Sequence, residues 1–310
     1  MIKKTLYFGN PAYLSLKNAQ MIIKLPEIES NDTLPNSFKE KNTITKPIED
    51  IGIIVLDNKQ ITITSGLLEA LLENNCAVIT CDSKGMPSGL MLPLYGNTTQ
   101  NERFRTQLDA SLPLKKQLWQ QTIQQKIANQ AAVLKETINA ETGCMHTWVK
   151  EVRSGDPDNL EGRAAAYYWK NLFGHIPGFT RERTGVAPNN LLNYGYAILR
   201  AVIARALVSS GLLPTLGIHH HNRYNAYCLA DDIMEPYRPY VDKLVYNHVE
   251  QYGENIELSK KIKAELLTIP TIDVTIHGKR SPLMIAATQS TASLYKCFAG
   301  ELRRLHYPEM

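Results

Sequence analysis

The spacing of apolar positions changes once along the chain. In residues 1–95, short runs of apolar, β-branched and aromatic residues alternate with polar ones, the period-2 pattern that is typical of strands. From about Asn97 onward, apolar residues recur every three or four positions, which is typical of amphipathic helices. The sequence therefore predicts an α+β chain, with a small β-rich N-terminal domain (residues 1–96) and a larger, mostly α-helical domain (residues 97–310).

The first domain is predicted to contain strands at residues 4–9 and 12–26, the second of which turns at Lys17-Asn18. The polar residues 31–42 are expected to form a loop. Residues 51–57 and 60–65 predict a second hairpin around Asn58-Lys59. A helix at residues 66–75, with Ser65 as its N-cap, and a strand at residues 76–82 complete this domain.

The second domain is predicted to be built from helices at residues 102–112, 115–138, 157–174, 188–211, 240–253, 255–267 and 284–305. A hairpin with its turn at Gly278 is expected at residues 271–283. The most apolar run, "AILRAVIARALVSSGLL", is interrupted by Arg200 and Arg205, so we expect neither a membrane span nor a membrane partner.

Charge is distributed unevenly, although the formal net charge of +4 is mild for 310 residues. Residues 1–95 contain nine lysines, ten acidic residues and no arginine, whereas all thirteen arginines lie from Arg103 onward. The guanidinium group of arginine forms paired hydrogen bonds with phosphate oxygens, so an anionic partner is expected to bind the second domain. Arginine also suits helices, and the composition leaves both explanations open.

Two compositional features exclude other classes of protein. Five scattered cysteines without a CxxC pair disfavour a structural zinc site and indicate reduced thiols in a cytoplasmic protein. The motif GxxxxGK[ST] does not occur, so a P-loop nucleotide site is not expected.

The segment "LGIHHHNRYNAYCLADDIMEPYRP" (residues 216–239) concentrates candidate chemistry. Asp232 and Glu235 are three residues apart, which places both carboxylates on one face of a helical turn. Pro236 is expected to end or bend that turn and to direct the carboxylates into a cleft. An ordinary acidic helix start is the alternative explanation of this pair.

A third carboxylate, Glu161, falls on the apolar, core-facing stripe formed with Ala165, Tyr168 and Leu172. A carboxylate on a core-facing stripe requires a cation, a proton or a metal, unless it is exposed at the helix start. The three adjacent histidines of residues 219–221 could be a solvated loop tip or metal ligands. Carboxylates with one imidazole suit Mg²⁺ or Mn²⁺ better than a structural zinc.

Five segments spread along the chain carry a family resemblance: "LYFGNPAYLSL", "NLEGRAAAYYW", "PNNLLNYGYAILRAVIARAL", "LGIHHHN" and "LADDIMEPYRP". In sequence and in order they resemble the CRISPR-associated adaptation integrases, the Cas-one family, in a type II-like variant. The resemblance implies a β-rich N-terminal domain and a helical, metal-dependent catalytic domain. It also implies a homodimer that joins a small partner, Cas-two, to insert new spacer DNA into a repeat array.

The resemblance also implies the site residues. The family's glutamate falls on Glu161 in "LEGRAA", and its histidine, which follows a glycine and two further residues, falls on His220. The acidic pair of the family's "DLMEPFRP" pattern falls on Asp232 and Glu235. The chain departs from the pattern in the flanking histidines and in Asp231, which could share or replace the role of Asp232.

The resulting hypothesis is phosphoryl transfer on double-stranded DNA. Mg²⁺ or Mn²⁺, held by Glu161, His220 and Glu235 with Asp232 close by, would polarise a repeat phosphate while the 3′-hydroxyl of the incoming prespacer attacks. With water as the nucleophile the same site would be a nuclease. The candidate DNA-binding residues are Arg103, Arg105, Arg163, Arg238, Arg303 and Arg304.

Two other classes of function remain open at this point. The chain could be a non-catalytic DNA-binding scaffold in which the acidic cluster braces the fold, and divalent-ion dependence of strand transfer separates this class from an enzyme. It could also be a metal hydrolase of another substrate class, which a DNA gel-shift experiment distinguishes.

Overall fold

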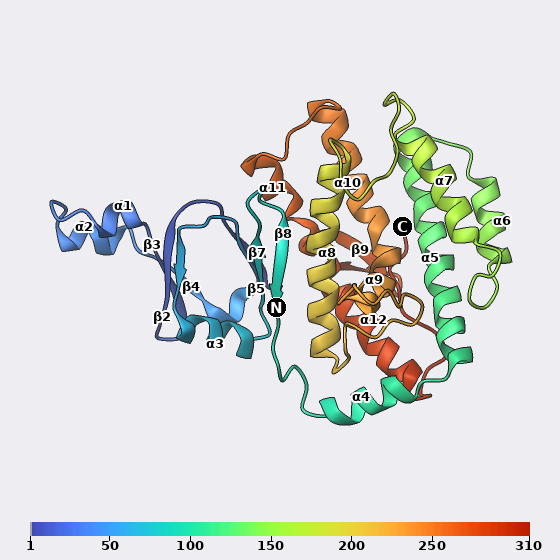
Figure 1. Cartoon of the computed structure of the whole chain (residues 1–310), viewed down its shortest axis with the longest axis horizontal. Helices are drawn as coiled ribbons and strands as arrows, with labels where there is room; N and C mark the ends of the chain where they lie inside the picture. Colours follow the sequence, from blue (N-terminus) through green and yellow to red (C-terminus); the bar gives the residue numbers. More distant parts are fainter. Residues whose placement is uncertain (1) are drawn as a thin grey trace. The chain divides into compact units, whose positions relative to one another are not determined.

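The structure, a computed structural model, describes residues 2–310 and divides into two compact units between Leu94 and Tyr95 (Figure 1). Strands dominate the N-terminal unit, whereas the unit from Tyr95 to Met310, called the helical unit below, consists mostly of helices. The predicted α+β class is therefore confirmed. The division lies two residues before the expected domain boundary.

The N-terminal unit contains two four-stranded sheets and three short helices. The first sheet has the order β1 (Lys4–Phe8), β5 (Ile51–Leu56), β7 (Ala77–Cys81) and β8 (Pro87–Met91). The second has the order β4 (Ile44–Pro47), β3 (Gln20–Lys24), β2 (Ala12–Lys17) and β6 (Ile61–Ile63). The helices are α1 (Pro26–Glu29), α2 (Asn36–Lys41) and α3 (Ser65–Glu73).

The predicted second hairpin is wrong. Strand β5 pairs in parallel with β1 and β7, whereas β6 pairs in parallel with β2 in the other sheet. Five of the six residues of β5 are buried, so this strand needs neighbours and cover on both faces, which a hairpin partner alone cannot supply. The short polar link between β5 and β6 therefore crosses from one sheet to the other.

Three further local predictions differ from the structure. Helix α2 lies within the polar stretch that was expected to be a loop; it buries no residue, so it leaves no apolar stripe to detect. Ser65 is the first residue of α3 rather than its cap, and no side chain caps this helix. Strand β8 and helix α6 (Gly143–Glu151) were not predicted.

The helical unit contains eight further helices and one hairpin in the described residues. They are α4 (Gln100–Asp109), α5 (Leu112–Ile138), α7 (Leu160–Leu172), α8 (Asn189–Ser209), α9 (Cys228–Met234), α10 (Arg238–Tyr252), α11 (Lys260–Leu266), α12 (Leu283–Phe298), and the hairpin β9 (Asp273–Ile276) and β10 (Lys279–Pro282). Short 3-10 turns occur at η1 (Ile48–Asp50) in the N-terminal unit and at η2 (Glu235–Tyr237) and η3 (Ile269–Thr271) in the helical unit.

Helix α8 forms the centre of the helical unit and packs against α9, α10, α11 and α12 (Figure 1). By length and composition it could cross a membrane, the one such helix in residues 2–310, but most of its surface is buried inside the unit. One of its charged residues, Arg200, forms an ion pair with Asp231 of α9. The helix is thus the core helix of this unit.

Helix α7 begins three residues after the predicted start, and its buried face differs from the predicted stripe at the first two positions, each shifted by one residue. The side chain of Asn159 caps the helix by accepting a hydrogen bond from the backbone N–H of Gly162. The fully buried stripe consists of Leu160, Ala164, Tyr168 and Leu172. Glu161 borders this stripe, and its side chain retains 25% exposure. The carboxylate can therefore face a cavity instead of the core.

The proline in "MEPYRP" shapes the segment that carries Glu235. Helix α9 ends at Met234, a 3-10 turn covers Glu235–Tyr237, and α10 starts at Arg238. Pro236 lacks an N–H donor and cannot continue an α-helix from the preceding turn, so the chain bends at this point, as its position predicts. The bend leaves Glu235 buried at the junction of two helices.

Gly195 allows the close approach of α8 and α10. A Cβ atom at this position would lie 2.6 Å from Cγ1 of Val241, a β-branched side chain that cannot move aside within the packed core. We expect Gly195→Ala to lower the free energy of unfolding by about 1–3 kcal/mol despite the better helix propensity of alanine. Urea denaturation followed by tryptophan fluorescence measures this, because all three tryptophans lie in the helical unit.

Gly143→Ala is the matched control, since a Cβ atom there meets nothing within 4 Å at the start of α6. This variant should unfold at the same urea concentration as the wild type or slightly above it. Equal behaviour of the two variants would show that α8 and α10 do not pack as closely as described.

Candidate active site

Two carboxylates from different elements meet at one lysine. Nζ of Lys126, in α5, lies 2.6 Å from Oε1 of Glu161 in α7 and 2.6 Å from Oε2 of Glu235 in η2. Nε of Arg238 donates a hydrogen bond of 2.8 Å to the other oxygen of Glu235. Glu161 and Glu235, which are far apart in sequence, therefore face a common point that is occupied by a cationic group.

The electrostatics of this cluster favour the ionised carboxylate. Burial opposes ionisation of Glu235, but the charges of Arg238 and Lys126 outweigh it and lower the pKa of this carboxyl to about 2. Burial also opposes the charge of Lys126, and the two glutamates outweigh it and raise the pKa of this ammonium. Both partners are thus charged at neutral pH.

Asp232 organises the loop of residues 216–227, called the histidine loop below. The carboxylate is fully buried and accepts backbone N–H bonds from Ile218 (2.7 Å), His219 (3.0 Å) and His220 (3.2 Å). It also lies 2.5 Å from Nδ1 of His220, and this hydrogen bond raises the pKa of the imidazole. With these contacts Asp232 holds the loop in place. Because Nδ1 of His220 is bonded to Asp232, Nε2 is the ring nitrogen that remains for the cavity described below, which His220 lines.

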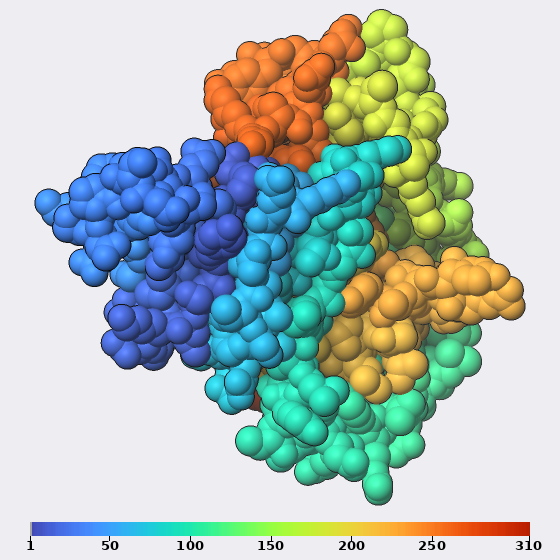
Figure 2. Space-filling view, turned by 60° about the vertical axis from the view of Figure 1, so that its left-hand side comes forward, coloured from blue at the N-terminus to red at the C-terminus, as the bar shows by residue number. Residues whose placement is uncertain are grey.

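The three histidines take different positions. The ring of His219 stacks on buried Trp119 with 4.1 Å between the ring centroids. His221 is exposed, and His220 alone of the three lines the cavity beside Lys126 and Glu235. The loop from Leu216 to Tyr227 lies within the gold segment that projects from the surface in Figure 2.

Asp231 and Asp232 face in different directions, although they are neighbours in sequence. Asp231 forms a 2.6 Å ion pair with Nε of Arg200 and accepts a hydrogen bond of 2.7 Å from Asn225. It therefore stabilises the far end of the histidine loop against α8. Of the two aspartates, Asp232 is the one that contacts His220.

A cavity of about 710 Å³, called the active-site cavity below, connects these groups. Lys126, His220 and Glu235 line one part of it, and Arg181, Arg183, Arg200 and Arg238 contribute four guanidinium groups. Glu161 reaches this region through its ion pair with Lys126. The carboxylates of Glu182, Asp231, Glu235 and Asp242 line the cavity as well, and the guanidinium groups are the part of the lining that is suited to the phosphates of a nucleic acid strand.

The six arginines that were candidates for DNA binding have different surroundings. Arg238 lines the active-site cavity but is held by Glu235. Arg103 donates to the carbonyl of Ser210 and stacks over Tyr295, so it has a structural role. The remaining four, Arg105, Arg163, Arg303 and Arg304, are exposed and lie outside the lining of the cavity.

Four further residues line the active-site cavity that no sequence motif had indicated: Lys126, Arg181, Arg183 and Arg200. The signal for Lys126 was present, because a lysine between Ile123 and Ile127 lies on the buried face of its helix and requires an anionic partner. The remaining three were not detectable from spacing. Two of them belong to an irregular segment before α8, and only the tertiary fold brings that segment to the cavity.

Asp242, also missed, lies in the wall of the active-site cavity. It is fully buried and accepts hydrogen bonds from the hydroxyl groups of Tyr196 and Tyr168. Burial raises the pKa of this carboxyl to about 7, against the hydrogen bonds from the two tyrosines, which lower it. Its charge therefore changes near neutral pH.

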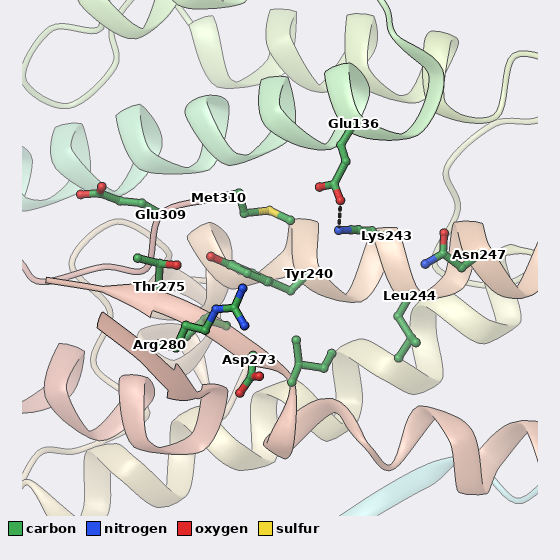
Figure 3. Close-up of a pocket in the computed structure, with 12 residues that line it drawn as sticks. Glu136, Tyr240, Lys243, Leu244, Asn247, Asp273, Thr275, Arg280, Glu309 and Met310 are labelled. Carbon is green, nitrogen blue, oxygen red and sulfur yellow. Dashed lines mark hydrogen bonds and ion pairs between the residues drawn. The ribbon is translucent and has the colours of Figure 1, made fainter. Parts of the chain in front are cut away.

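A second cavity, of about 540 Å³, lies between α10 and the β9–β10 hairpin (Figure 3). It contains an ion pair between Lys243 and Glu136, with the guanidinium of Arg280 nearby. None of the predicted catalytic or DNA-binding residues lines it. The second cavity is thus separate from the candidate catalytic residues.

The donor set fits a hard divalent cation. Within residues 2–310, no three His, Cys, Asp or Glu side chains are arranged as ligands around one point. The position between Glu161 and Glu235 is instead taken by the ammonium group of Lys126, whose positive charge stands where a metal ion would bind. Oε2 of Glu235 is buried with Nζ of Lys126 2.6 Å away, so a metal would bind this oxygen in place of the ammonium.

Comparison with known proteins decides the family. The family model for the CRISPR associated protein Cas1 matches residues 8–255. The CRISPR-associated endonuclease Cas1 of Neisseria meningitidis serogroup C (strain 8013) is 37% identical over 294 residues, which cover 94% of this chain and 91% of that protein. The chain belongs to the Cas1 family. The predicted family is confirmed, and the Neisseria relative is named an endonuclease.

Solved structures show the same fold. A casposase bound to its integration product superimposes with a TM-score of 0.76 at 22% identity and covers 98% of this chain and 92% of its own. A Cas6-RT-Cas1–Cas2 complex superimposes with a TM-score of 0.71 at 19% identity, covering 97% of this chain and 35% of that chain. The Cas1 fold therefore extends over both units.

Asp242 predicts a dependence of stability on pH. Its pKa is about 7 in the folded chain and about 4 in the unfolded chain, so the folded state binds more protons between these values. The free energy of unfolding consequently falls as the pH rises to about 7 and does not change further above it. Between about pH 5 and pH 8, the free energy of unfolding should fall by roughly 2 kcal/mol more for the wild type than for Asp242→Asn, because asparagine does not titrate.

Urea denaturation at both pH values measures this difference. Asp273→Asn serves as a control, because it removes an exposed carboxylate of the same unit and should follow the wild type. A parallel loss of stability in the wild type and in Asp242→Asn would show that Asp242 does not titrate in this range.

Proposed function

We propose that this Cas1-family protein is a metal-dependent DNA integrase and endonuclease of CRISPR adaptation, of the type II-like kind, acting in the cytoplasm. The observation that carries the proposal is that Glu161 and Glu235 meet at Lys126, beside a cavity that Glu235, His220 and four arginines line. The Neisseria relative is named an endonuclease, and the casposase was captured with its integration product. Both names describe phosphodiester chemistry on DNA.

In this proposal Glu161, Glu235 and Nε2 of His220 hold Mg²⁺ or Mn²⁺, which supplies positive charge at the scissile phosphate when bound. Asp232 holds the imidazole through Nδ1, which keeps the lone pair of Nε2 directed at the site. This assigns Asp232 the role of a positioning residue instead of a ligand, because its oxygens already accept three backbone N–H bonds.

The proposed reaction exchanges one phosphodiester for another. The 3′-oxygen of the incoming strand forms a bond to a phosphorus of the repeat, while the bond from that phosphorus to the adjacent 3′-oxygen breaks in line. Arg183 and Arg200 would bind neighbouring backbone phosphates and orient the two strands. With water in place of the 3′-hydroxyl, the same groups would support a nuclease.

The proposed assembly is a homodimer joined to Cas2 and bound to double-stranded prespacer and repeat DNA. One structural neighbour is part of a Cas1–Cas2 complex. We assign dimer assembly to the arginine-free N-terminal domain (residues 1–96) and most DNA contacts to the helical domain (residues 97–310). The distribution of arginine supports this division, since backbone contacts supply most of the affinity for DNA.

One observation favours a non-catalytic scaffold as the second candidate. Lys126, Glu161, Glu235 and Arg238 form a closed set of ion pairs that could brace three helices without any metal. The two candidates differ in one measurement. A scaffold binds DNA equally well with or without divalent ions and transfers no strand, whereas the integrase requires Mg²⁺ or Mn²⁺ for transfer.

Glu161→Gln and His220→Ala should each lower the rate of strand transfer by at least about 100-fold while DNA binding is retained, because each removes a metal ligand. The assay is integration into a repeat-bearing plasmid with purified Cas2, Mg²⁺ or Mn²⁺ and a prespacer. His219→Ala and His221→Ala are the controls and should keep most of the activity. Inactivity of His221→Ala together with activity of His220→Ala would move the assignment by one residue.

Arg183→Gln should weaken DNA binding and lower the slope of log K against log salt by about one, since it removes one phosphate contact. Arg183 is exposed on the wall of the active-site cavity. Arg280→Gln is the matched control, because Arg280 is exposed in the second cavity (Figure 3). Fluorescence anisotropy at several salt concentrations measures both, and equal slopes for the two variants would contradict the assigned DNA path.

A further inference from the structure

Lys126 occupies an unusual position for a lysine. Its side chain is only 10% exposed, and its ammonium lies 2.6 Å from a carboxylate oxygen of Glu161 and 2.6 Å from one of Glu235. These are the two carboxylates that the proposed function assigns to the metal. A lysine ammonium and a divalent cation thus compete for the same pair of oxygens.

The charges of the cluster show why both cations cannot be bound in this arrangement. Glu161 and Glu235 carry two negative charges, and Lys126 and Arg238 carry two positive ones, so the cluster is neutral as it stands. A divalent cation placed on the same oxygens would lie within a few ångströms of the ammonium in a poorly solvated site. Repulsion between them would be strong at that separation.

The geometry allows Lys126 to leave. Nζ of Lys126 donates a hydrogen bond to Oε1 of Glu161 and lies 2.6 Å from Oε2 of Glu235, so a divalent cation on the same two carboxylates would replace both contacts at once. Lys126 lines the active-site cavity together with Arg200 and His220. Its four-carbon stem can turn the ammonium toward the lumen of the cavity, where a phosphate of the DNA would lie.

We propose that Lys126 is the internal counter-ion of the metal site: it neutralises Glu161 and Glu235 in the metal-free protein, is displaced by the divalent cation, and then contacts a phosphate of the bound DNA. The inference rests on the proposed function. It explains how the buried carboxylate of Glu235 and the partly exposed carboxylate of Glu161 remain ionised and correctly placed before a metal binds. It also makes metal binding and DNA binding cooperative, because the displaced ammonium requires a new anionic partner.

Metal binding to the full chain without DNA tests whether Lys126 competes with the divalent cation. Isothermal titration with Mn²⁺ at constant pH compares the wild type with Lys126→Met, which keeps the length of the stem and removes the charge. The dissociation constant of Lys126→Met should be about tenfold lower, since no internal cation competes. Lys126→Arg retains the charge and should bind Mn²⁺ no more tightly than the wild type.

Lys135→Met is the matched control, because Lys135 lies on the same helix and is exposed. It should bind Mn²⁺ as the wild type does. Should Lys126→Met not fold, Lys126→Gln removes the charge while preserving a hydrogen bond donor, and the same tenfold change is expected. Unchanged or weaker binding in the folded charge-removing variant overturns the competition.

A salt titration of DNA binding tests whether the displaced ammonium contacts a phosphate. With EDTA, the wild type and Lys126→Met should show the same slope of log K against log salt, because the ammonium is engaged with the carboxylates. With Ca²⁺, the slope of the wild type should exceed that of Lys126→Met by about one in magnitude, because one phosphate contact has been added. Equal slopes with Ca²⁺ overturn the phosphate contact.

Failure of this inference is distinguishable from failure of the proposed function. If the wild type binds Mn²⁺ and Glu161→Gln abolishes that binding, the metal site stands whatever Lys126 does. If the wild type binds no Mn²⁺, or if Glu161→Gln binds it equally well, the metal site is wrong and the role of Lys126 is overturned with it.

Discussion

Buried negative charge is the constraint on which the helical unit depends. Glu235, Asp232 and Asp242 lie almost fully inside it, and an unpaired buried carboxylate would cost several kcal/mol. Each is compensated by different chemistry. Arg238 and Lys126 supply cations to Glu235, backbone N–H groups and an imidazole surround Asp232, and two tyrosine hydroxyls donate to Asp242. Since these partners come from α5, α7, α8, α10 and the histidine loop, the compensation also ties the elements together.

The turn that carries Glu235 is held from outside the cluster as well. Asn129, buried in α5, donates from Nδ2 to the carbonyl oxygens of Pro236 (2.8 Å) and Pro308 (3.0 Å). The hydroxyl of Tyr237, one residue further, lies 2.6 Å from that of Ser290 in α12. The bend therefore has a fixed position relative to two helices and to the C-terminal residues. A rigid support of this kind is what a site needs if ligands from several elements are to meet within a few tenths of an ångström.

In the active-site cavity, the charged groups differ in how deeply they are buried. The carboxylates and their partners lie at the base of the active-site cavity, whereas Arg183 and Arg200 are more exposed along its wall. A DNA strand bound along the wall would bring a phosphate toward the carboxylates, and a cation at the base would offset their mutual repulsion. This order of charges connects the fold to phosphodiester chemistry, and it is consistent with the Cas1 family to which the chain belongs.

The change from period 2 to period 3.6 determined the α+β class and the approximate division of the chain, because amphipathic periodicity follows directly from burial of one face. The spacing of Asp232, Glu235 and Pro236 indicated the bend, and motif resemblance indicated Glu161 and His220. Only the tertiary structure showed that Asp232 holds the loop, that Lys126 stands between the two glutamates, and that β5 and β6 belong to different sheets. These features depend on contacts between residues far apart in sequence. Local patterns record which face of an element is buried, but they do not record which distant group will meet it there.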